Sequence, residues 1–317
     1  MVHLGDVRPG TNPKMSPESY VAEREKRFLS LYAEVRRAVR PPKMASWVHS
    51  LPGQEEKLFA IFLQGLCGDA YSGEKLYRAL GGWNRFVSIA GSNDRRAIGD
   101  AWLSVKDRLR FLKHRRVEHR SFIVGKDPWR DFERSASYKY WELTSTAGTQ
   151  VRFFTRHFWD VFNDLLEIPG AGRTLAFDLI EDVYRNVVDH ADLRPRSLCI
   201  EGSTGPLKGL LLLCFGSRRL HMRDLKAKAE LLWGKDIPPW EALETYSQNL
   251  VFEAEELARP SERSVEYVVF QLEDLICNYQ KPNILQVEGI ADLPAAFLDG
   301  QVDAADFAVQ YIRAYER

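Results

Sequence analysis

Cysteine is scarce in this chain of 317 residues, and its four cysteines stand far apart. No two of them have the short C-x-x-C spacing of structural zinc sites, and together they cannot make the closely spaced loop that holds an iron–sulfur cluster. Widely separated thiols are typical of proteins from reducing compartments. We therefore expect reduced, buried thiols, no metal and no cofactor. The four residues are Cys67, Cys199, Cys214 and Cys277.

Long apolar runs are also missing. None is longer than six residues, the length of the run at residues 210–215, which is far shorter than the roughly 20 residues that a helix needs to cross a bilayer. The N-terminal residues lack the apolar stretch that follows the charges of a secretory signal. The sequence thus predicts a soluble, cytoplasmic protein without a membrane partner, and no feature points to a protein partner.

The net charge is zero, yet the charges are unevenly distributed along the chain. Residues 231–317 contain six Lys or Arg against sixteen Asp or Glu, whereas residues 105–130 contain nine basic against three acidic side chains. A second basic group follows within residues 218–228. Dense basic clusters are typical of nucleic-acid-binding surfaces, and a solvated helix face has the same composition. If the first cluster contacts DNA phosphates, Arg115 and Arg116 are the contacts that we expect.

The apolar residues recur mostly at helical spacing, and strand-type alternation is rare. This pattern predicts an all-α fold, and the length favours two lobes or one large domain. Residues 120–124 and 207–215 fit a buried strand or a buried helix equally well. The predicted helices start with one at Ser16-Pro17, and the others cover residues 55–66, 73–80, 95–113, 149–166, 172–188, 239–257 and 262–278.

The most informative segment is a Pro-Gly-x-Gly turn, Pro169-Gly170-Ala171-Gly172, between two apolar helical patterns. Two glycines suit such a turn because a tight reversal needs backbone angles that other residues avoid, and because a phosphate oxygen must approach the backbone closely. The N–H groups at the start of the second helix, at Arg173 and Thr174, would then bind that phosphate. The same four residues also describe many tight loops without this role.

This segment resembles the helix–hairpin–helix of DNA repair glycosylases, in which an apolar residue, Pro-Gly-x-Gly and a basic residue follow one another. In that superfamily the catalytic aspartate follows the hairpin at a fixed distance, which here falls on Asp192, twenty residues after Gly172. Asp189 is the competing carboxylate, and helix capping at the surface is the alternative role of both. The resemblance implies a glycosylase-like fold of two helical lobes with a cleft between them.

The hairpin also differs from part of that superfamily. Bifunctional members have a lysine two residues after the second glycine, where this chain has Thr174. Threonine cannot form a Schiff base, so the resemblance implies a monofunctional enzyme without lyase activity. Asp192 would stabilise an oxocarbenium-like sugar and orient or deprotonate the attacking water, leaving an abasic site.

A second resemblance involves residues 198–209 and 272–281. They are similar to a phage-associated group of α-glutamyl/putrescinyl thymine pyrophosphorylases and amino acid:DNA transferases, which includes an antiphage glycosylase acting on glucosylated hydroxymethylcytosine. Glu201 and Lys208 are candidates for recognising a polar substituent on the base, with a solvent-exposed loop as the alternative. Trp141 is a candidate for stacking on the base, and it would serve equally well in the core.

These observations favour a monofunctional DNA glycosylase that excises a hypermodified or glucosylated pyrimidine from phage DNA, in antiphage defence. One alternative is an amino acid or polyamine:DNA transferase in phage thymine hypermodification, and another is a non-enzymatic DNA-binding module. We expect three regions: an N-terminal helical region with the basic cluster at 1–140, a catalytic hairpin region at 141–230 and an acidic helical region at 231–317. The expected partner is DNA with modified bases.

Overall fold

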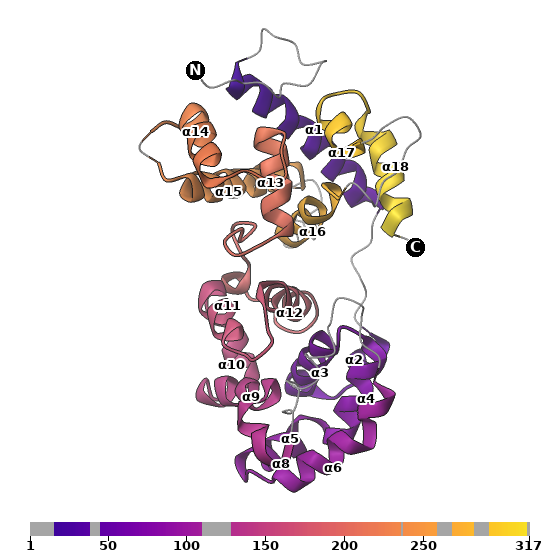
Figure 1. Cartoon of the computed structure of the whole chain (residues 1–317). Coiled ribbons are helices and arrows are strands. Elements are labelled where there is room, and N and C mark those ends of the chain that lie inside the picture. The colour runs from indigo at the N-terminus through magenta and orange to yellow at the C-terminus, as the bar shows by residue number, and fades with distance from the viewer. Residues whose placement is uncertain are drawn as a thin grey trace. The chain divides into compact units, whose positions relative to one another are not determined.

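The computed structural model describes residues 16–38, 45–109, 128–235, 237–258, 268–281 and 292–315. Within these ranges every regular element is a helix, as Figure 1 shows, so the predicted all-α fold is confirmed. None of the helices in these ranges combines the length and the apolar surface that a membrane crossing requires.

The chain packs into two compact units. Unit 1 comprises residues 1–41 and 196–317, and unit 2 comprises residues 42–195. These boundaries follow packing, and they differ from the three regions, 1–140, 141–230 and 231–317, that charge and motifs suggest. As a consequence, the Pro-Gly-x-Gly turn and residues 198–209, which we expected in one region, belong to different units. The expected cleft between two lobes stays a prediction.

Among its described residues, unit 2 contains the helices α2 to α6 and α8 to α12 and three short 3₁₀ helices. Its elements are α2 (Ser46–His49), α3 (Gly53–Cys67), α4 (Ala70–Leu80), α5 (Gly82–Gly91), α6 (Arg95–Val105), η1 (Lys106–Arg108), α8 (Pro128–Asp131), η2 (Phe132–Arg134), α9 (Ala136–Thr146), α10 (Gln150–Phe154), α11 (Phe158–Leu166), α12 (Arg173–Asn186) and η3 (Ala191–Leu193).

Helix α3 is the centre of unit 2. Residues 58–63 are buried without interruption, and a helix that is apolar on all sides needs neighbours on all sides. Helices α4, α5, α10 and α12 supply them. Two stacked ring pairs connect α3 to α9 and α5: Phe62 lies 3.8 Å from Tyr140 of α9, and Phe59 lies 4.8 Å from Phe86 of α5, measured between ring centroids.

Two adjacent carboxylates at the start of α3 bind the first turns of two other helices. Glu55 accepts a hydrogen bond from the backbone N–H of Gln150 in α10 at 3.1 Å. Glu56 accepts hydrogen bonds from the backbone N–H of Trp83 in α5 and from the hydroxyl of Tyr77, both at 2.6 Å. Burial raises the pKa of the Tyr77 phenol, and the neighbouring carboxylate adds to the effect. A negative charge is favourable at a helix N-terminus. Glu55 and Glu56 therefore stabilise the starts of α10 and α5 and join both helices to α3.

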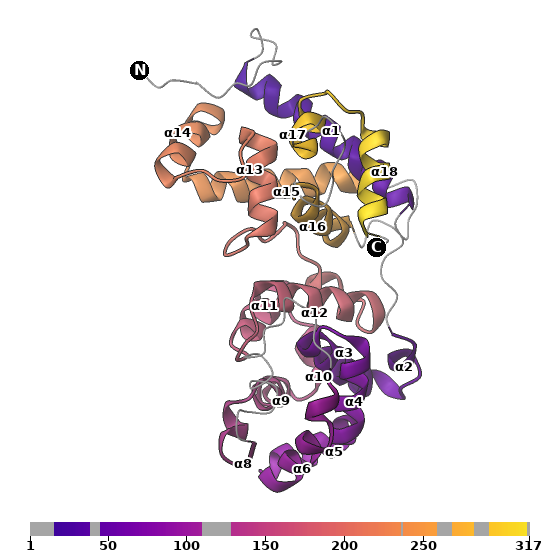
Figure 2. The same ribbon diagram turned by 45° about the vertical axis from the view of Figure 1, so that its right-hand side comes forward.

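Unit 1 combines the N-terminal helix with the C-terminal part of the chain. Its helices are α1 (Pro17–Ala38), α13 (Gly205–Phe215), α14 (Met222–Trp233), α15 (Pro239–Ala258), α16 (Val268–Tyr279), α17 (Leu293–Leu298) and α18 (Ala304–Tyr315). Helix α18 runs beside α1 in both Figure 1 and Figure 2, and the two helices are in contact.

Arg24 of α1 holds three parts of unit 1 together. Its guanidinium donates to the carbonyl oxygen of Leu212 at 2.8 Å, in the last turn of α13. It also pairs with the carboxylate of Asp299, just after α17, at 2.5 Å, and lies 4.3 Å from the centroid of the Tyr20 ring. Since only 3% of the Arg24 side chain is exposed, this pair is structural.

The structure refines several predicted helices. The expected helix at 149–166 is two helices, α10 and α11, because the chain breaks at residues 155–157, where His157 caps α11. The ambiguous residues 207–215 form helix α13. Helix α5 is not among the predicted helices. It follows α4 without a connecting loop, because Gly81 and Gly82, with φ +80° and +78°, end α4 and begin α5. Residues 120–124 lie outside the described residues.

Candidate functional site

The Pro-Gly-x-Gly turn connects α11 to α12 in unit 2. Helix α11 ends at Leu166, the side chain of Ile168 turns into the core, and the backbone N–H of Ala171 donates to the carbonyl of Ile168 at 2.9 Å. Gly170 has φ +78°, in the left-handed region that glycine adopts at little cost. Gly170 therefore meets the requirement of a tight reversal for backbone angles that other residues avoid.

Gly172 is placed differently from Gly170. It is the N-cap of α12, with extended backbone angles of φ −100° and ψ 176° that any residue can adopt. A Cβ atom built at this position would meet nothing within 4 Å. Arg173 is partly exposed with its guanidinium carbon 5.5 Å from the centroid of the Phe177 ring, and Thr174 is exposed. The turn thus presents an open backbone at the start of α12, while phosphate binding by Pro169, Gly170, Gly172, Arg173 and Thr174 stays a prediction.

The charge of the hairpin weighs against a dominant role in DNA binding. Residues 158–186 carry six carboxylates and two arginines. One of these arginines, Arg185, pairs with Glu181 on the same helix at 2.6 Å, and both side chains are nearly buried. Two further carboxylates pair with cations from outside the hairpin, Asp164 with Arg156 and Glu167 with Lys139. The hairpin therefore keeps a small negative net charge and by itself does not attract an anionic backbone.

The predicted catalytic residue Asp192 lies in the same unit as the hairpin. It belongs to η3, which packs against α11 and is anchored by the fully buried side chain of Leu193. Its carboxylate is 64% exposed, and its Oδ2 lies 4.0 Å from Nδ1 of His190. Asp189 is exposed as well. The carboxylate is therefore accessible and close to the first helix of the hairpin, which is a necessary condition for the predicted role.

The two segments of the second resemblance pack against each other in unit 1. Helix α13 contains Gly205 and Gly209 on one face, and a side chain at either position would overlap α16: Gly205 with Cys277 and Gly209 with the backbone of Ile276. The hydroxyl of Tyr279 donates to the carbonyl of Gly209 at 2.8 Å. The two segments thus form one helix crossing, whose Gly-x-x-x-Gly spacing is visible in the sequence and which our sequence analysis missed.

The predicted base-pocket residues are distributed over both units. Trp141 in unit 2 is partly buried, and its ring lies 5.2 Å from that of Tyr138. Its indole N–H is buried, with no hydrogen-bond partner among the described residues. In unit 1, Glu201 is exposed next to Gly202, whose φ is +67°, and Lys208 is partly exposed on α13. Arg115 and Arg116 lie outside the described residues.

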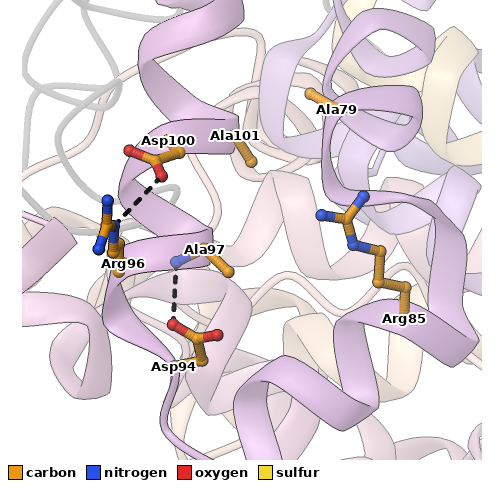
Figure 3. A pocket seen from close by; sticks show the side chains of 7 residues that line it. All are labelled: Ala79, Arg85, Asp94, Arg96, Ala97, Asp100 and Ala101. Carbon is orange, nitrogen blue, oxygen red and sulfur yellow. Dashed lines mark hydrogen bonds and ion pairs between the residues drawn. The ribbon is translucent and has the colours of Figure 1, made fainter.

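An open hollow of about 310 Å³ lies among α4, α5 and α6 (Figure 3). Figure 3 shows Asp94 accepting from the backbone N–H of Ala97, at 3.0 Å, and Arg96 beside Asp100, at 3.9 Å. The lining has two cationic and two anionic side chains, so it has no net charge and favours neither an anionic nor a cationic ligand. None of the predicted site residues belongs to it. The lining residues are Ala79, Arg85, Asp94, Arg96, Ala97, Asp100 and Ala101.

Comparison with known families supports one of the two resemblances. The sequence model of the amino acid:DNA transferase family matches residues 42–286. The chain belongs to this family. The match covers all of unit 2, with the hairpin and Asp192, and the α13–α16 crossing of unit 1. It supports the transferase branch of the resemblance and gives no support to the glycosylase superfamily. No curated protein and no solved structure matches the chain.

Proposed function

We propose that this protein is an amino acid:DNA transferase that joins an amine, from an amino acid or a polyamine, to an activated pyrimidine in phage DNA. The family match over residues 42–286 carries this proposal. The base is activated at its exocyclic methylene carbon by a pyrophosphate group. The amine nitrogen attacks that carbon, the carbon–oxygen bond breaks, pyrophosphate leaves with the electron pair, and the nitrogen loses a proton.

This reaction makes three demands on the protein. A cationic surface must hold the DNA and the leaving pyrophosphate, a carboxylate must accept the proton of the amine, and a pocket must hold the extruded base. Asp192 is our candidate for the proton acceptor, because its carboxylate is exposed within the matched part of the chain. Trp141, Glu201 and Lys208 are candidates for the pocket, and Arg115 and Arg116 for phosphate contacts.

The direct test is to incubate DNA containing a pyrophosphorylated hydroxymethyl pyrimidine with the protein and a panel of amines, followed by mass spectrometry of the nucleosides. We expect a nucleoside whose mass equals that of the hydroxymethyl nucleoside plus the amine minus one water, one pyrophosphate released per transfer, and no alkali-labile sites. Free base together with alkali-labile abasic sites would contradict the transferase and would establish the glycosylase.

The glycosylase is the second candidate, and one observation favours it. Asp192 follows Gly172 by twenty residues and is exposed on an element that packs against the first helix of the hairpin. In that case the enzyme is monofunctional, because Thr174 replaces the lysine that lyase chemistry needs. Its substrate would be a hypermodified or glucosylated pyrimidine in phage DNA, and its role antiphage defence.

The variant Asp192→Asn tests the carboxylate under both enzyme hypotheses, and Asp189→Asn is its matched control. Either chemistry predicts loss of product by about 10²-fold or more with Asp192→Asn, unchanged DNA binding, and near-normal product with Asp189→Asn. Full biological effect of Asp192→Asn would favour the non-enzymatic DNA-binding module instead.

A further inference from the structure

We propose that an exposed basic surface of unit 1, formed by Arg219, Arg223 and Lys226 and here named the α14 basic face, contacts the phosphate backbone of the substrate DNA. The inference rests on the proposed function, because it assigns a docking surface to a DNA-modifying enzyme. It locates in unit 1 the positive potential that the acidic hairpin of unit 2 does not supply.

The structure divides the basic residues of 218–228 into two kinds. Arg218 is structural, because its guanidinium forms two hydrogen bonds to the carboxylate of Asp292, at 2.7 and 2.8 Å, and a third to the carbonyl of Gln280. Lys228 points back to the carbonyl of Phe215 at the end of α13, at 3.5 Å. Neither cation is directed toward solvent, which leaves three of the five for an external partner.

Arg219 projects from a loop of fixed conformation. The hydroxyl of Ser217 donates to the carbonyl of Arg219 at 2.8 Å, and Arg218, its neighbour, is tied to the N-cap of α17. The Arg219 side chain itself is exposed. A cation on an ordered loop loses less conformational entropy on binding than one on a free chain, which suits a phosphate contact.

Arg223 and Lys226 lie on the solvent side of α14, whose other side buries Leu225 and Ala229. Their side chains are 96% and 67% exposed. Each has an acidic neighbour, Asp224 or Glu230, but at 3.9 Å in water. Ion pairs of this kind contribute little, so both cations can exchange these partners for DNA phosphates at small cost.

The charge of the surrounding chain favours an approach of DNA to the α14 basic face. Residues 219–230 carry a net charge of +2, from four basic and two acidic side chains, whereas residues 231–317 carry a net charge of −10, from six basic and sixteen acidic side chains. A polyanion is repelled by the second stretch and attracted by the first, and such contrast orients an approaching ligand.

The experiment measures binding of the full chain to a fluorescent 30-base-pair duplex of unmodified DNA at several KCl concentrations. The test variant is Arg219→Ala/Arg223→Ala. The matched control is Lys26→Ala/Arg313→Ala, which removes two exposed cations from α1 and α18 of the same unit. Each lost phosphate contact lowers the slope of log K against log[KCl] by about 0.9. We expect the test variant to lose about 2 units of slope and to bind every sequence more weakly, and the control to match the wild type.

An unchanged slope in the test variant, or an equal loss in the control, would overturn the α14 basic face. Transfer assays separate this outcome from failure of the proposed function. If the wild type transfers an amine and the test variant keeps its slope and its KM for DNA, the surface is wrong and the function stands. If the slope falls as expected and the wild type transfers nothing, the surface stands and the transferase is wrong.

Discussion

At the scale of single residues, the clearest feature is the use of two neighbouring glutamates to begin three helices. Glu55 and Glu56 stand in the first turn of α3, where acidic residues are common. Their position in the first turn of this helix can be predicted from the sequence. Their bonds to α10 and α5 are not, because Gln150 and Trp83 lie far along the chain and reach these carboxylates only after the helices have packed.

The variant Glu56→Ala should destabilise the protein by about 2–3 kcal/mol, because it leaves the Tyr77 hydroxyl and the Trp83 N–H without their acceptor. Urea unfolding followed by circular dichroism measures the change. The control is Glu74→Ala in α4, which removes an exposed pair with Arg78 and should cost less than about 0.5 kcal/mol. Equal losses in the two variants would show that the capping bonds contribute nothing.

At the scale of elements, α13 and α16 approach each other because glycine removes two side chains from their contact. Gly209→Ala would place a Cβ against the backbone of Ile276, which cannot move aside as a side chain can. We expect a loss of about 3 kcal/mol from overpacking. Gly91→Ala at the end of α5 is the control, since its Cβ would meet Trp141 at an ordinary 3.7 Å, and it should leave the unfolding midpoint nearly unchanged.

The two glycines of the hairpin should respond in opposite ways. Gly170→Ala forces alanine into a left-handed conformation, φ +78°, and should cost about 1 kcal/mol. Gly172→Ser introduces a favourable N-cap at extended angles in open space and should leave stability equal or higher by a few tenths of a kcal/mol. If a phosphate docks on this turn, Gly172→Ser weakens DNA binding without a loss of stability. Unchanged DNA binding would mean that the turn serves only to connect α11 and α12.

At the scale of the whole molecule, the two units differ in whether one continuous segment or two separate segments of the chain form them. Unit 2 is continuous, whereas unit 1 needs α1, which brings the fully buried Phe28 and Leu31 and the tie between Arg24 and Asp299. A fragment of residues 42–195 should therefore unfold cooperatively by itself. A fragment of residues 196–317 should do so only when a peptide containing α1 is added. Cooperative unfolding of residues 196–317 alone would show that α1 is dispensable.

The sequence by itself determined the all-α class, the positions of the long helices α1, α3, α12 and α15, and the place of the Pro-Gly-x-Gly turn, because helical periodicity, Gly and Pro act over a few neighbouring residues. It could not show that the helix expected at 149–166 breaks at His157, nor that α5 follows α4 without a loop.

Only the tertiary structure decided which charges are available to a partner. Arg218 and Arg219 are adjacent and chemically identical in the sequence, yet one is bound to Asp292 and the other faces solvent. The same holds for the division into units, in which α1 joins a part of the chain more than 150 residues away. The physical reason is that burial and ion pairing depend on contacts between distant segments, and these contacts exist only once the chain has folded.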